Sequence, residues 1–348
     1  MNVVDLLRDL IRFPTQQGGG TERPLCEYVA GLLRADEVVV EDATRSDGTP
    51  GAYVFARWGT PARVINAHVD TVPANAGWSR SPWEPAVVGD RLYGLGAADT
   101  KGAIAATLCA LDGHAPQDRG VLFSGDEEAG SGAMHAFLKS RHAAGIREVI
   151  VCEPSARRAG IAHRGVLAQT ATLAGPGGHS SKADHLPKPL ATLARMAVAL
   201  DELGVSLVGS GPTGMTGTCL NIAALHGGVA FNVIAGRAEL EWSLRPYPGF
   251  DRAAWDAAVS HLAPAGATLA TTLDHAAFED ASLAPLVAPF VREAGPLDYW
   301  TEAAMWQAHG VAAIVIGPGD IAQAHSADEF VPLADLDWAV ELYRALLS

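Results

Sequence analysis

Side chains that can bind metal ions follow four apolar segments of the sequence. His68 follows the first segment, and Glu127 and Glu128 follow the second. Glu153 ends the third segment, and His325 follows the fourth after a short glycine-containing turn. Imidazole and carboxylate ligands without thiolates suit zinc, cobalt or manganese. The pattern therefore predicts a metal site assembled from the ends of separate strands.

A fifth candidate ligand, Asp99, lies in the glycine-rich segment 94–102, which leads into an apolar helical pattern. A carboxylate in such a turn can bridge two cations, and the loop glycines let the backbone approach the site closely. Two histidines and three carboxylates are enough for a two-metal site with the metals ~3.5–4 Å apart.

The paired acids Glu127 and Glu128 indicate what such a site would catalyse. Adjacent side chains diverge, so one acid can bind metal while the other takes a proton from water. Bound cations can lower the pKa of water to about 7, which favours hydrolysis at neutral pH. Asp70, two residues after His68, is placed to accept the second imidazole N–H of that ligand.

The elements that must position these residues are those of an α/β fold. Non-alternating apolar runs are typical of strands buried on both faces, and helical patterns at 102–111, 131–141 and 333–347 separate or follow them. This order predicts a mainly parallel sheet with helices on both faces. Ligands of such sheets bind beyond the carboxyl ends of the strands, where all four candidate segments end. The predicted strands are 63–67, 120–124, 148–152 and 312–316.

The middle of the chain has a different pattern and predicts a second domain. Its order of strand, helix, two strands, helix and strand is that of a split βαβ sandwich. We expect an inserted α+β lid or dimerisation domain at 165–274 and a metal-binding catalytic domain formed by 1–164 and 275–348.

Composition excludes several other classes of protein. The formal net charge of −14 argues against nucleic acid or an anionic membrane as partner, because both require a basic surface. No apolar run approaches the ~18 residues of a membrane span, and the N-terminus predicts an amphipathic helix instead of a signal peptide. The four cysteines are widely spaced, which favours reduced thiols. These features predict a cytoplasmic protein.

Alternative interpretations of single residues remain. An isolated histidine at a strand end or an isolated glutamate pair is usually a solvated or hydrogen-bonded group without catalytic function. The Gly94 and Gly96 pair resembles part of a nicotinamide-binding motif, but Asp99 stands where that motif has its third glycine. A non-catalytic metal-binding or amino-acid-binding module would keep the ligands without needing Glu127.

The motifs resemble the M20 metallopeptidase family, and most specifically its acetylornithine and acetylcitrulline deacetylase branch. The resemblance covers nearly the whole chain in order, and the segments from Trp300 to Ala303 and from Ala324 to Glu329 favour this branch over succinyl-diaminopimelate desuccinylases. The matching segments are 68–73, 99–102, 126–128, 152–154, 178–180 and 317–325.

The resemblance implies roles for the metal ligands and the base. It implies that His68 and Glu153 bind one metal, that Glu128 and His325 bind the other, and that Asp99 bridges them. Two zinc ions per subunit are implied, with cobalt as a possible substitute. Glu127 would be the general base.

Residues of the inserted domain are implied to contact the substrate. His179 would stabilise the tetrahedral oxyanion, often across a homodimer. Arg245 would hold the substrate α-carboxylate, for which a bidentate guanidinium is apt, and Asn232 would face the substrate with its amide.

The implied activity is removal of the acetyl group from N-acetylornithine or N-acetylcitrulline, a small-molecule step of arginine biosynthesis. Other M20 activities remain as alternatives, namely succinyl-diaminopimelate desuccinylase, carboxypeptidase and aminoacylase. The sequence departs from the family pattern at Leu95, where many relatives have a basic residue, and at Ala235, where proline is usual. Leu95 is shared with acetylcitrulline deacetylases, and this resemblance favours the uncharged ureido side chain of citrulline over the ornithine ammonium.

Overall fold

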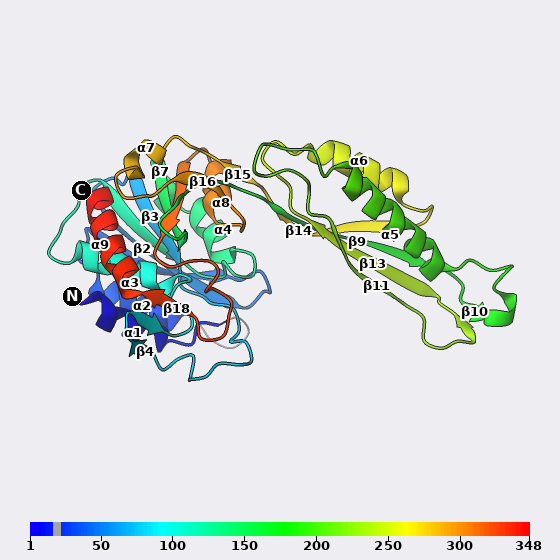
Figure 1. Cartoon of the computed structure of the whole chain (residues 1–348), viewed down its shortest axis with the longest axis horizontal. Helices are drawn as coiled ribbons and strands as arrows, with labels where there is room; N and C mark the ends of the chain where they lie inside the picture. The colour runs from blue at the N-terminus through cyan, green and yellow to red at the C-terminus, as the bar shows by residue number, and fades with distance from the viewer. Residues whose placement is uncertain (17–21) are drawn as a thin grey trace. The chain divides into compact units, whose positions relative to one another are not determined.

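The chain divides into two units in this computed structural model, which describes residues 1–16 and 22–348. The first unit comprises Met1–Ile161, Asp280–Leu297 and Thr301–Ser348. The second comprises Ala162–Glu279 and Asp298–Trp300, and it contains all of the predicted insertion. Figure 1 labels the elements of both units, which are described separately below.

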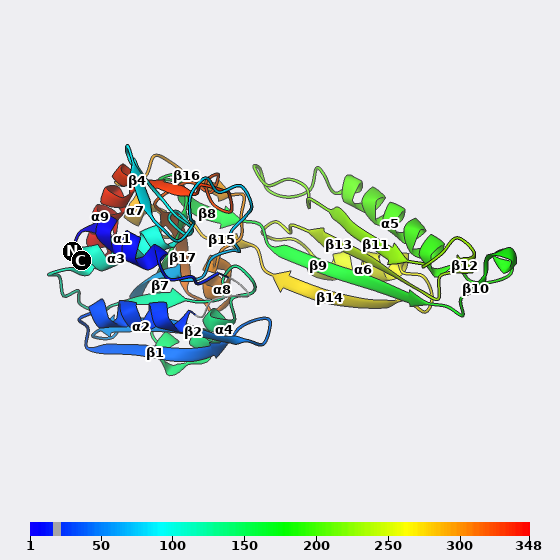
Figure 2. The same ribbon diagram turned by 90° about the horizontal axis from the view of Figure 1, so that it is seen from below.

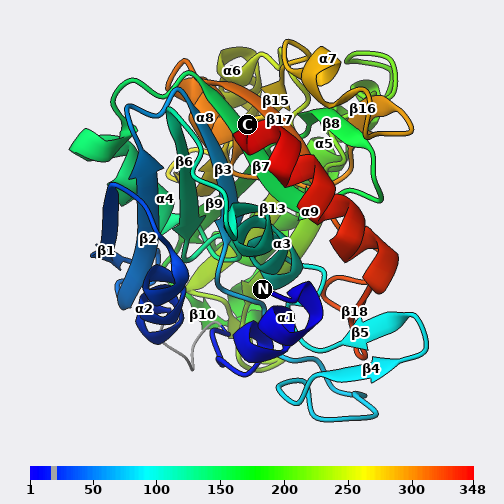
Figure 3. The ribbon, with the colours of Figure 1, turned by 90° about the vertical axis from the view of Figure 1, so that its left-hand side faces the viewer.

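A nine-stranded sheet built mainly from the first unit has the four predicted apolar strands at its centre (Figure 3). Its order is β1-β2-β6-β3-β7-β17-β8-β15, and β16 pairs with β8. β3 is parallel to β6 and β7, and β17 is parallel to β7, whereas the outer strands are antiparallel. The predicted α/β class is confirmed. The strands are β1 (Glu37–Thr44), β2 (Pro50–Trp58), β3 (Arg63–His68), β6 (Arg119–Ser124), β7 (Glu148–Pro154), β8 (Ala159–His163), β15 (Phe278–Glu279), β16 (Ala294–Leu297) and β17 (Ala312–Gly317).

Helices cover both faces of this sheet, as predicted. In β2, Ala52 and Val54 face a core shared with α1, α2, α3 and α9, whereas Phe55 contacts Phe137 of α4 on the opposite face. Phe137 also contacts Trp306 of α8. The helices are α1 (Val3–Ile11), α2 (Arg23–Leu32), α3 (Lys101–Leu111), α4 (Gly132–Lys139), α7 (Ala284–Val287), α8 (Ala303–Ala308) and α9 (Leu333–Leu347).

Two details of the helices matter for the site. All residues of α3 are buried, so the segment that follows Asp99 is anchored in the core and not on the surface. The helix predicted at 131–141 ends at Lys139, and a separate 3-10 turn follows at Arg141–Ala143. The break occurs because the extended Ser140 caps that turn with its side chain, which accepts from the His142 N–H.

A small sheet of order β18-β5-β4 joins two segments that matter for the site. Its strands are β4 (Ala86–Val88), β5 (Arg91–Tyr93) and β18 (Phe330–Pro332). β5 immediately precedes the glycine-rich segment 94–102, and β18 follows the segment that contains His325. Phe330 of β18 pairs with Tyr93 of β5. The glycine-rich segment therefore begins beside the point where the segment that contains His325 ends.

The second unit has the predicted β-α-β-β-α-β order (Figure 2). Its four-stranded antiparallel sheet has the order β11-β13-β9-β14, and α5 and α6 pack on one face over a common apolar core. A short β10-β12 pair lies beside it in the same unit. The elements are β9 (Val166–Ala174), β10 (Gly178–His179), a 3-10 turn at Ser180–Lys182, α5 (Pro189–Ser206), β11 (Asn221–Gly227), β12 (Val233–Ile234), β13 (Arg237–Leu244), α6 (Arg252–Leu262) and β14 (Thr268–His275).

Among the described residues, none of the helices combines the length and apolar character that a membrane crossing requires.

Candidate metal centre

The centre lies in the first unit at the carboxyl ends of the parallel strands. His68 is the last residue of β3 and pairs with Ser124, the last residue of the parallel neighbour β6. Glu153 lies near the end of β7 on the other side of β3. Because these strands run in the same direction, residues that are far apart in sequence converge at one edge of the sheet.

Asp99 lies between the two candidate histidine ligands. Its Oδ1 is 2.8 Å from Nε2 of His68, and its Oδ2 is 3.3 Å from Nε2 of His325. Oε1 of Glu128 is 3.0 Å from Nε2 of His325, and Oε2 of Glu153 is 3.9 Å from Nε2 of His68. Ligand atoms of His68, Asp99 and Glu128 all lie within 4.8 Å of one another.

The charges of this cluster fit divalent cations. Burial raises the pKa of Glu153 well above its usual range, and it also raises the pKa of Glu128. Burial opposes the charged form of His68, yet hydrogen bonds to Asp70 and Asp99 raise its pKa well above its usual range. Hydrogen bonds that the His325 imidazole donates to Asp99 and Glu128 raise its pKa to about 10. Without a metal, protons on the histidines balance the carboxylate charge, and bound cations would supply the same compensation.

Asp70 lies close both to the His68 imidazole and to the paired acids. Nδ1 of His68 is 2.9 Å from the main-chain oxygen of Asp70 but 3.6 Å from its carboxylate, so the main-chain oxygen makes the shorter contact. The carboxylate is engaged elsewhere, because its two oxygens accept from the backbone N–H groups of Glu127 and Glu128, each at 3.1 Å. Asp70 therefore orients the ligand imidazole through its backbone and the paired acids through its side chain.

Glu127 lies in the same turn as Glu128, and burial raises its pKa well above the usual range, with repulsion from Glu153 adding to the effect. A carboxyl group with a raised pKa is suited to taking and returning a proton near neutral pH. Glu127 is therefore a candidate base beside the candidate metal ligands.

A buried ion-pair network behind this turn was not predicted from the sequence. Arg45 contacts Glu22 at 2.9 Å and Asp126 at 3.4 Å, and all three side chains are at most 3% exposed. The Asp126 carboxylate also accepts from Ser46 and from the Gly132 N–H. The network fixes the turn that carries Glu127 and Glu128. Only the position of Asp126, next to the paired acids, could have indicated it.

Glu302 lies beneath the strand ends in a second buried network. Its Oε2 accepts from Ser124 Oγ at 2.7 Å, and Ser124 accepts from Asn66, which in turn accepts from the Trp306 indole N–H. Burial raises the pKa of Glu302 to about 7, although the hydrogen bond from Ser124 lowers it. The carboxyl group also raises the pKa of Glu127 and Glu153 by repulsion.

The raised pKa of Glu302 predicts a pH-dependent stability of the metal-free protein. Its folded pKa of about 7 exceeds its unfolded value of 4.5, so its contribution is full below pH 4.5 and is lost as the pH rises to 7. The expected loss is about 3 kcal/mol. The control is Glu302→Gln, which has no carboxyl group to titrate. Urea unfolding should show wild-type stability falling relative to this variant across pH 4.5–7, whereas parallel curves would contradict the prediction.

The remaining predicted site residues lie in the second unit. His179 ends β10 and is exposed, and its Nδ1 is 2.8 Å from Ser181 Oγ. Asn232 precedes β12, and its main-chain oxygen accepts from the Ser180 N–H. Arg245 follows β13 and is exposed. Their roles toward a substrate remain predictions.

Comparisons with known proteins bear on the whole chain. Residues 64–348 match the family described as Peptidase family M20/M25/M40. The chain is 35% identical over 364 residues to N-acetyl-L-citrulline deacetylase from Xanthomonas campestris pv. campestris, covering 100% of this chain and 98% of that protein. It is 29% identical over 309 residues to acetylornithine deacetylase from Aliivibrio fischeri, covering 82% and 80%.

The fold resembles that of an M20 family metallo-carboxypeptidase from Sulfolobus solfataricus. The two structures share a TM-score of 0.80 at 18% sequence identity, over 100% of this chain and 99% of the other. At this identity the likeness concerns the fold.

Proposed function

The chain belongs to peptidase family M20/M25/M40, as its motifs predicted, and is therefore a metallohydrolase. On this basis we propose that it removes the acetyl group from N-acetylcitrulline or N-acetylornithine. The observation that carries the hydrolytic chemistry is the position of Asp99, whose two oxygens face two different histidines. A place in arginine biosynthesis belongs to the same proposal. The full-length similarity to a citrulline-type deacetylase favours N-acetylcitrulline.

The proposed ligand sets are those that the family resemblance implies, and the distances are compatible with them. His68 and Glu153 would hold one zinc ion, with Nε2 and Oε2 3.9 Å apart, a separation that leaves room for an ion between them. His325 and Glu128 would hold the other, and Asp99 would contribute one oxygen to each. Cobalt has similar ligand preferences and would substitute.

The proposed reaction is the addition of water to the acetyl carbonyl. The two cations, when bound, would lower the pKa of water and polarise the carbonyl group. Glu127 takes a proton from the water as its oxygen bonds to the carbonyl carbon. His179 donates a hydrogen bond to the oxyanion that forms. Glu127 then returns the proton to the leaving nitrogen as the C–N bond breaks, which gives acetate and the free amino acid.

Substrate recognition is proposed for residues of the second unit and for Leu95. Arg245 would bind the α-carboxylate, and Asn232 would bind the substrate through its amide. Leu95 is 3% exposed and lies in the same glycine-rich segment as Asp99. An apolar residue there would not compensate an ammonium charge, so it supports the uncharged citrulline side chain.

A homodimer is part of the proposal, and the length of β13 supports it. Asn232 precedes this strand, and Arg245 follows it. Its eight residues span roughly 27 Å at ~3.4 Å per residue. His179 pairs with Val233 and so lies at the Asn232 end. An N-acetyl amino acid is only about 7 Å long, about two extended residues, so one second unit cannot present both ends of β13 to it.

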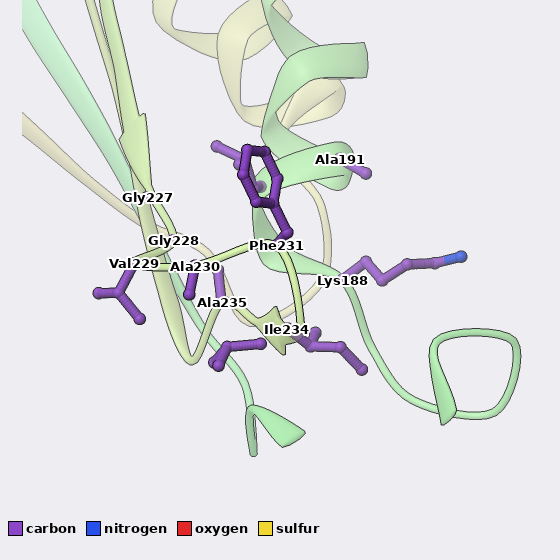
Figure 4. A pocket seen from close by; sticks show the side chains of 11 residues that line it. Lys188, Ala191, Gly227, Gly228, Val229, Ala230, Phe231, Ile234 and Ala235 are labelled. Carbon is purple, nitrogen blue, oxygen red and sulfur yellow. The ribbon is translucent and has the colours of Figure 1, made fainter. Parts of the chain in front are cut away.

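An apolar surface at the Asn232 end also supports a homodimer. A pocket of about 660 Å³ lies there, lined by residues 227–231 and 233–235 and by the start of α5, and Figure 4 shows these side chains around it. Val229 is 88% exposed and Phe231 is fully exposed. Large exposed apolar groups in one place indicate an interaction surface. A second subunit seated on this surface would lie close to His179, which pairs with Val233.

A substrate panel tests the proposed activity. N-acetylcitrulline and N-acetylornithine should be hydrolysed with the highest kcat/KM, ahead of N-acetylmethionine, N-succinyl-diaminopimelate and a dipeptide. The carboxamide of acetylcitrulline should lose most of its kcat/KM, because an Arg245 guanidinium without its carboxylate costs about 2–5 kcal/mol. Fastest cleavage of the succinyl compound or the dipeptide would refute the substrate assignment. Fastest cleavage of acetylmethionine would refute the preference for a polar side chain.

A further inference from the structure

We propose that Glu329 is a positioning residue that clamps the loop of Asp99 to the loop of His325 and thereby sets the spacing of the metal ligands. This inference rests on the proposed function, because it assumes that Asp99 and His325 bind metal. Glu329 itself does not contact the reacting atoms in this account.

The Glu329 side chain accepts three backbone N–H groups from the loop that carries Asp99. Its Oε2 accepts from Gly96 at 2.9 Å, and its Oε1 accepts from Ala98 at 2.8 Å and from Asp99 at 3.1 Å. Glu329 is 1% exposed, so water does not compete for these donors. Bonds from N–H groups to a buried carboxylate are stronger than bonds between neutral groups.

The loop needs an acceptor at this position because its backbone turns sharply. Gly96 has φ +80°, and a Cβ there would come within 2.9 Å of Thr71 and 3.1 Å of Lys101. The N–H groups of Gly96, Ala98 and Asp99 point inward from this loop, and buried main-chain N–H groups need acceptors. Glu329 supplies both acceptor oxygens from a different part of the chain.

The same residue is fixed to the loop of His325. Glu329 follows His325 by only four residues, and its main-chain oxygen accepts from the Gly94 N–H at 3.0 Å. The next residue, Phe330, pairs with Tyr93. The main chain of Glu329 therefore holds the beginning of the Asp99 loop, and its side chain holds Asp99 itself. A displaced carboxylate would change the 3.3 Å separation of Asp99 and His325.

A buried lysine interacts electrostatically with the clamp, although burial lowers its pKa to about 7. Lys101, the first residue of α3, is 1% exposed and attracts Glu329 electrostatically. Its Nζ donates to the main-chain oxygen of Phe13 at 2.9 Å. The clamp is thus part of a buried polar arrangement that fixes both ends of the segment from Gly96 to Lys101.

The test compares Glu329→Gln with Glu329→Asp, and uses Asp328→Asn as the matched control. Glutamine has one acceptor oxygen and would turn an NH₂ group toward backbone donors, while aspartate keeps the charge but is one methylene shorter. Asp328 is the neighbouring acid, and its carboxylate accepts from Ser79 outside the Asp99 loop. Zinc and cobalt dissociation constants are measured by chelator competition at a temperature where circular dichroism shows each protein folded.

We expect Glu329→Gln to bind the metals about 10–100-fold more weakly, with a changed visible absorption spectrum of the cobalt-loaded protein. Glu329→Asp should lose less affinity, and Asp328→Asn should match the wild type. A purely structural role would lower the unfolding free energy of the metal-free variants and leave the dissociation constants and the cobalt spectrum unchanged. That result would overturn the inference, and Glu329→Asp decides the question if Glu329→Gln does not fold. A wild-type protein that binds no metal would instead refute the proposed function.

Discussion

Replacement of Glu127 by glutamine is expected to lower kcat by about 10²–10⁴-fold while the protein retains its metals. Glutamine keeps the size and polarity of the side chain but cannot accept a proton at neutral pH. The backbone N–H of residue 127 would still bind Asp70, so the turn should keep its conformation. Metal content by elemental analysis and turnover with N-acetylcitrulline measure the two effects separately.

Glu128→Gln is the matched control for this prediction. The Glu128 carboxylate lies 3.0 Å from His325 and belongs to the candidate ligand cluster, so its replacement should weaken metal binding. If Glu127→Gln instead loses metal and keeps its turnover per bound metal, the two acids have the opposite roles. A Glu127→Gln protein with wild-type turnover would mean that Glu127 is not the general base, whereas a wild-type protein that binds metal without any turnover would support the non-catalytic metal-binding interpretation.

Replacement of His179 by alanine is expected to lower kcat by about 10²–10³-fold without changing the metal content. This is the usual effect of removing one donor to an oxyanion. His179 belongs to the second unit, whereas every candidate metal ligand belongs to the first, so its loss should not disturb the metal site. Retained metal with a reduced kcat would support an oxyanion donor and exclude a metal ligand. An unchanged kcat would show that His179 does not take part in the reaction.

A mixed dimer tests whether His179 acts across subunits. Co-expression of His179→Ala and Glu127→Gln chains with different tags allows purification of dimers that contain one chain of each kind. If His179 acts on the partner subunit, one site of each mixed dimer has both residues, and about half of the wild-type activity should return. Activity no higher than that of the two inactive homodimers would mean that His179 acts within its own subunit.

The sequence predicted the centre of the fold because its strands are marked by composition. Strands buried on both faces read as continuous apolar runs, so β3, β6, β7 and β17 were identified within one or two residues. The strands β1 and β8, which lie outside the four central strands, were not predicted. β1 is only partly buried and carries acids among its valines, and β8 is short and contains glycine and histidine.

The candidate metal ligands could be predicted because they follow strand ends and match the order of the family motifs. The residues that hydrogen-bond to the loops of these ligands could not be predicted. Arg45, which also pairs with Glu22, reaches Asp126 from a segment that precedes the first predicted strand. Glu329 binds main-chain N–H groups of the Asp99 loop. Because every residue except proline has such a group, the amino-acid sequence does not indicate these bonds.

The behaviour of Asp70 illustrates the same limit. The spacing of Asp70 from His68 indicated that the two residues lie close together. Asp70 has two acceptors that could face the imidazole, namely its main-chain oxygen and its carboxylate. The main-chain oxygen lies nearer because the turn of Glu127 and Glu128 presents two N–H donors to the carboxylate. Sequence spacing gives proximity, whereas the arrangement of donors decides which atom makes the contact.

The most direct test of the central claim is a metal titration of protein stripped by a strong chelator. Hydrolysis of N-acetylcitrulline should be absent in the metal-free protein, and it should return on addition of zinc or cobalt and saturate near two equivalents per chain. Full activity in rigorously metal-free protein would contradict the assignment of His68, Asp99, Glu128, Glu153 and His325 as the ligands of a hydrolytic centre.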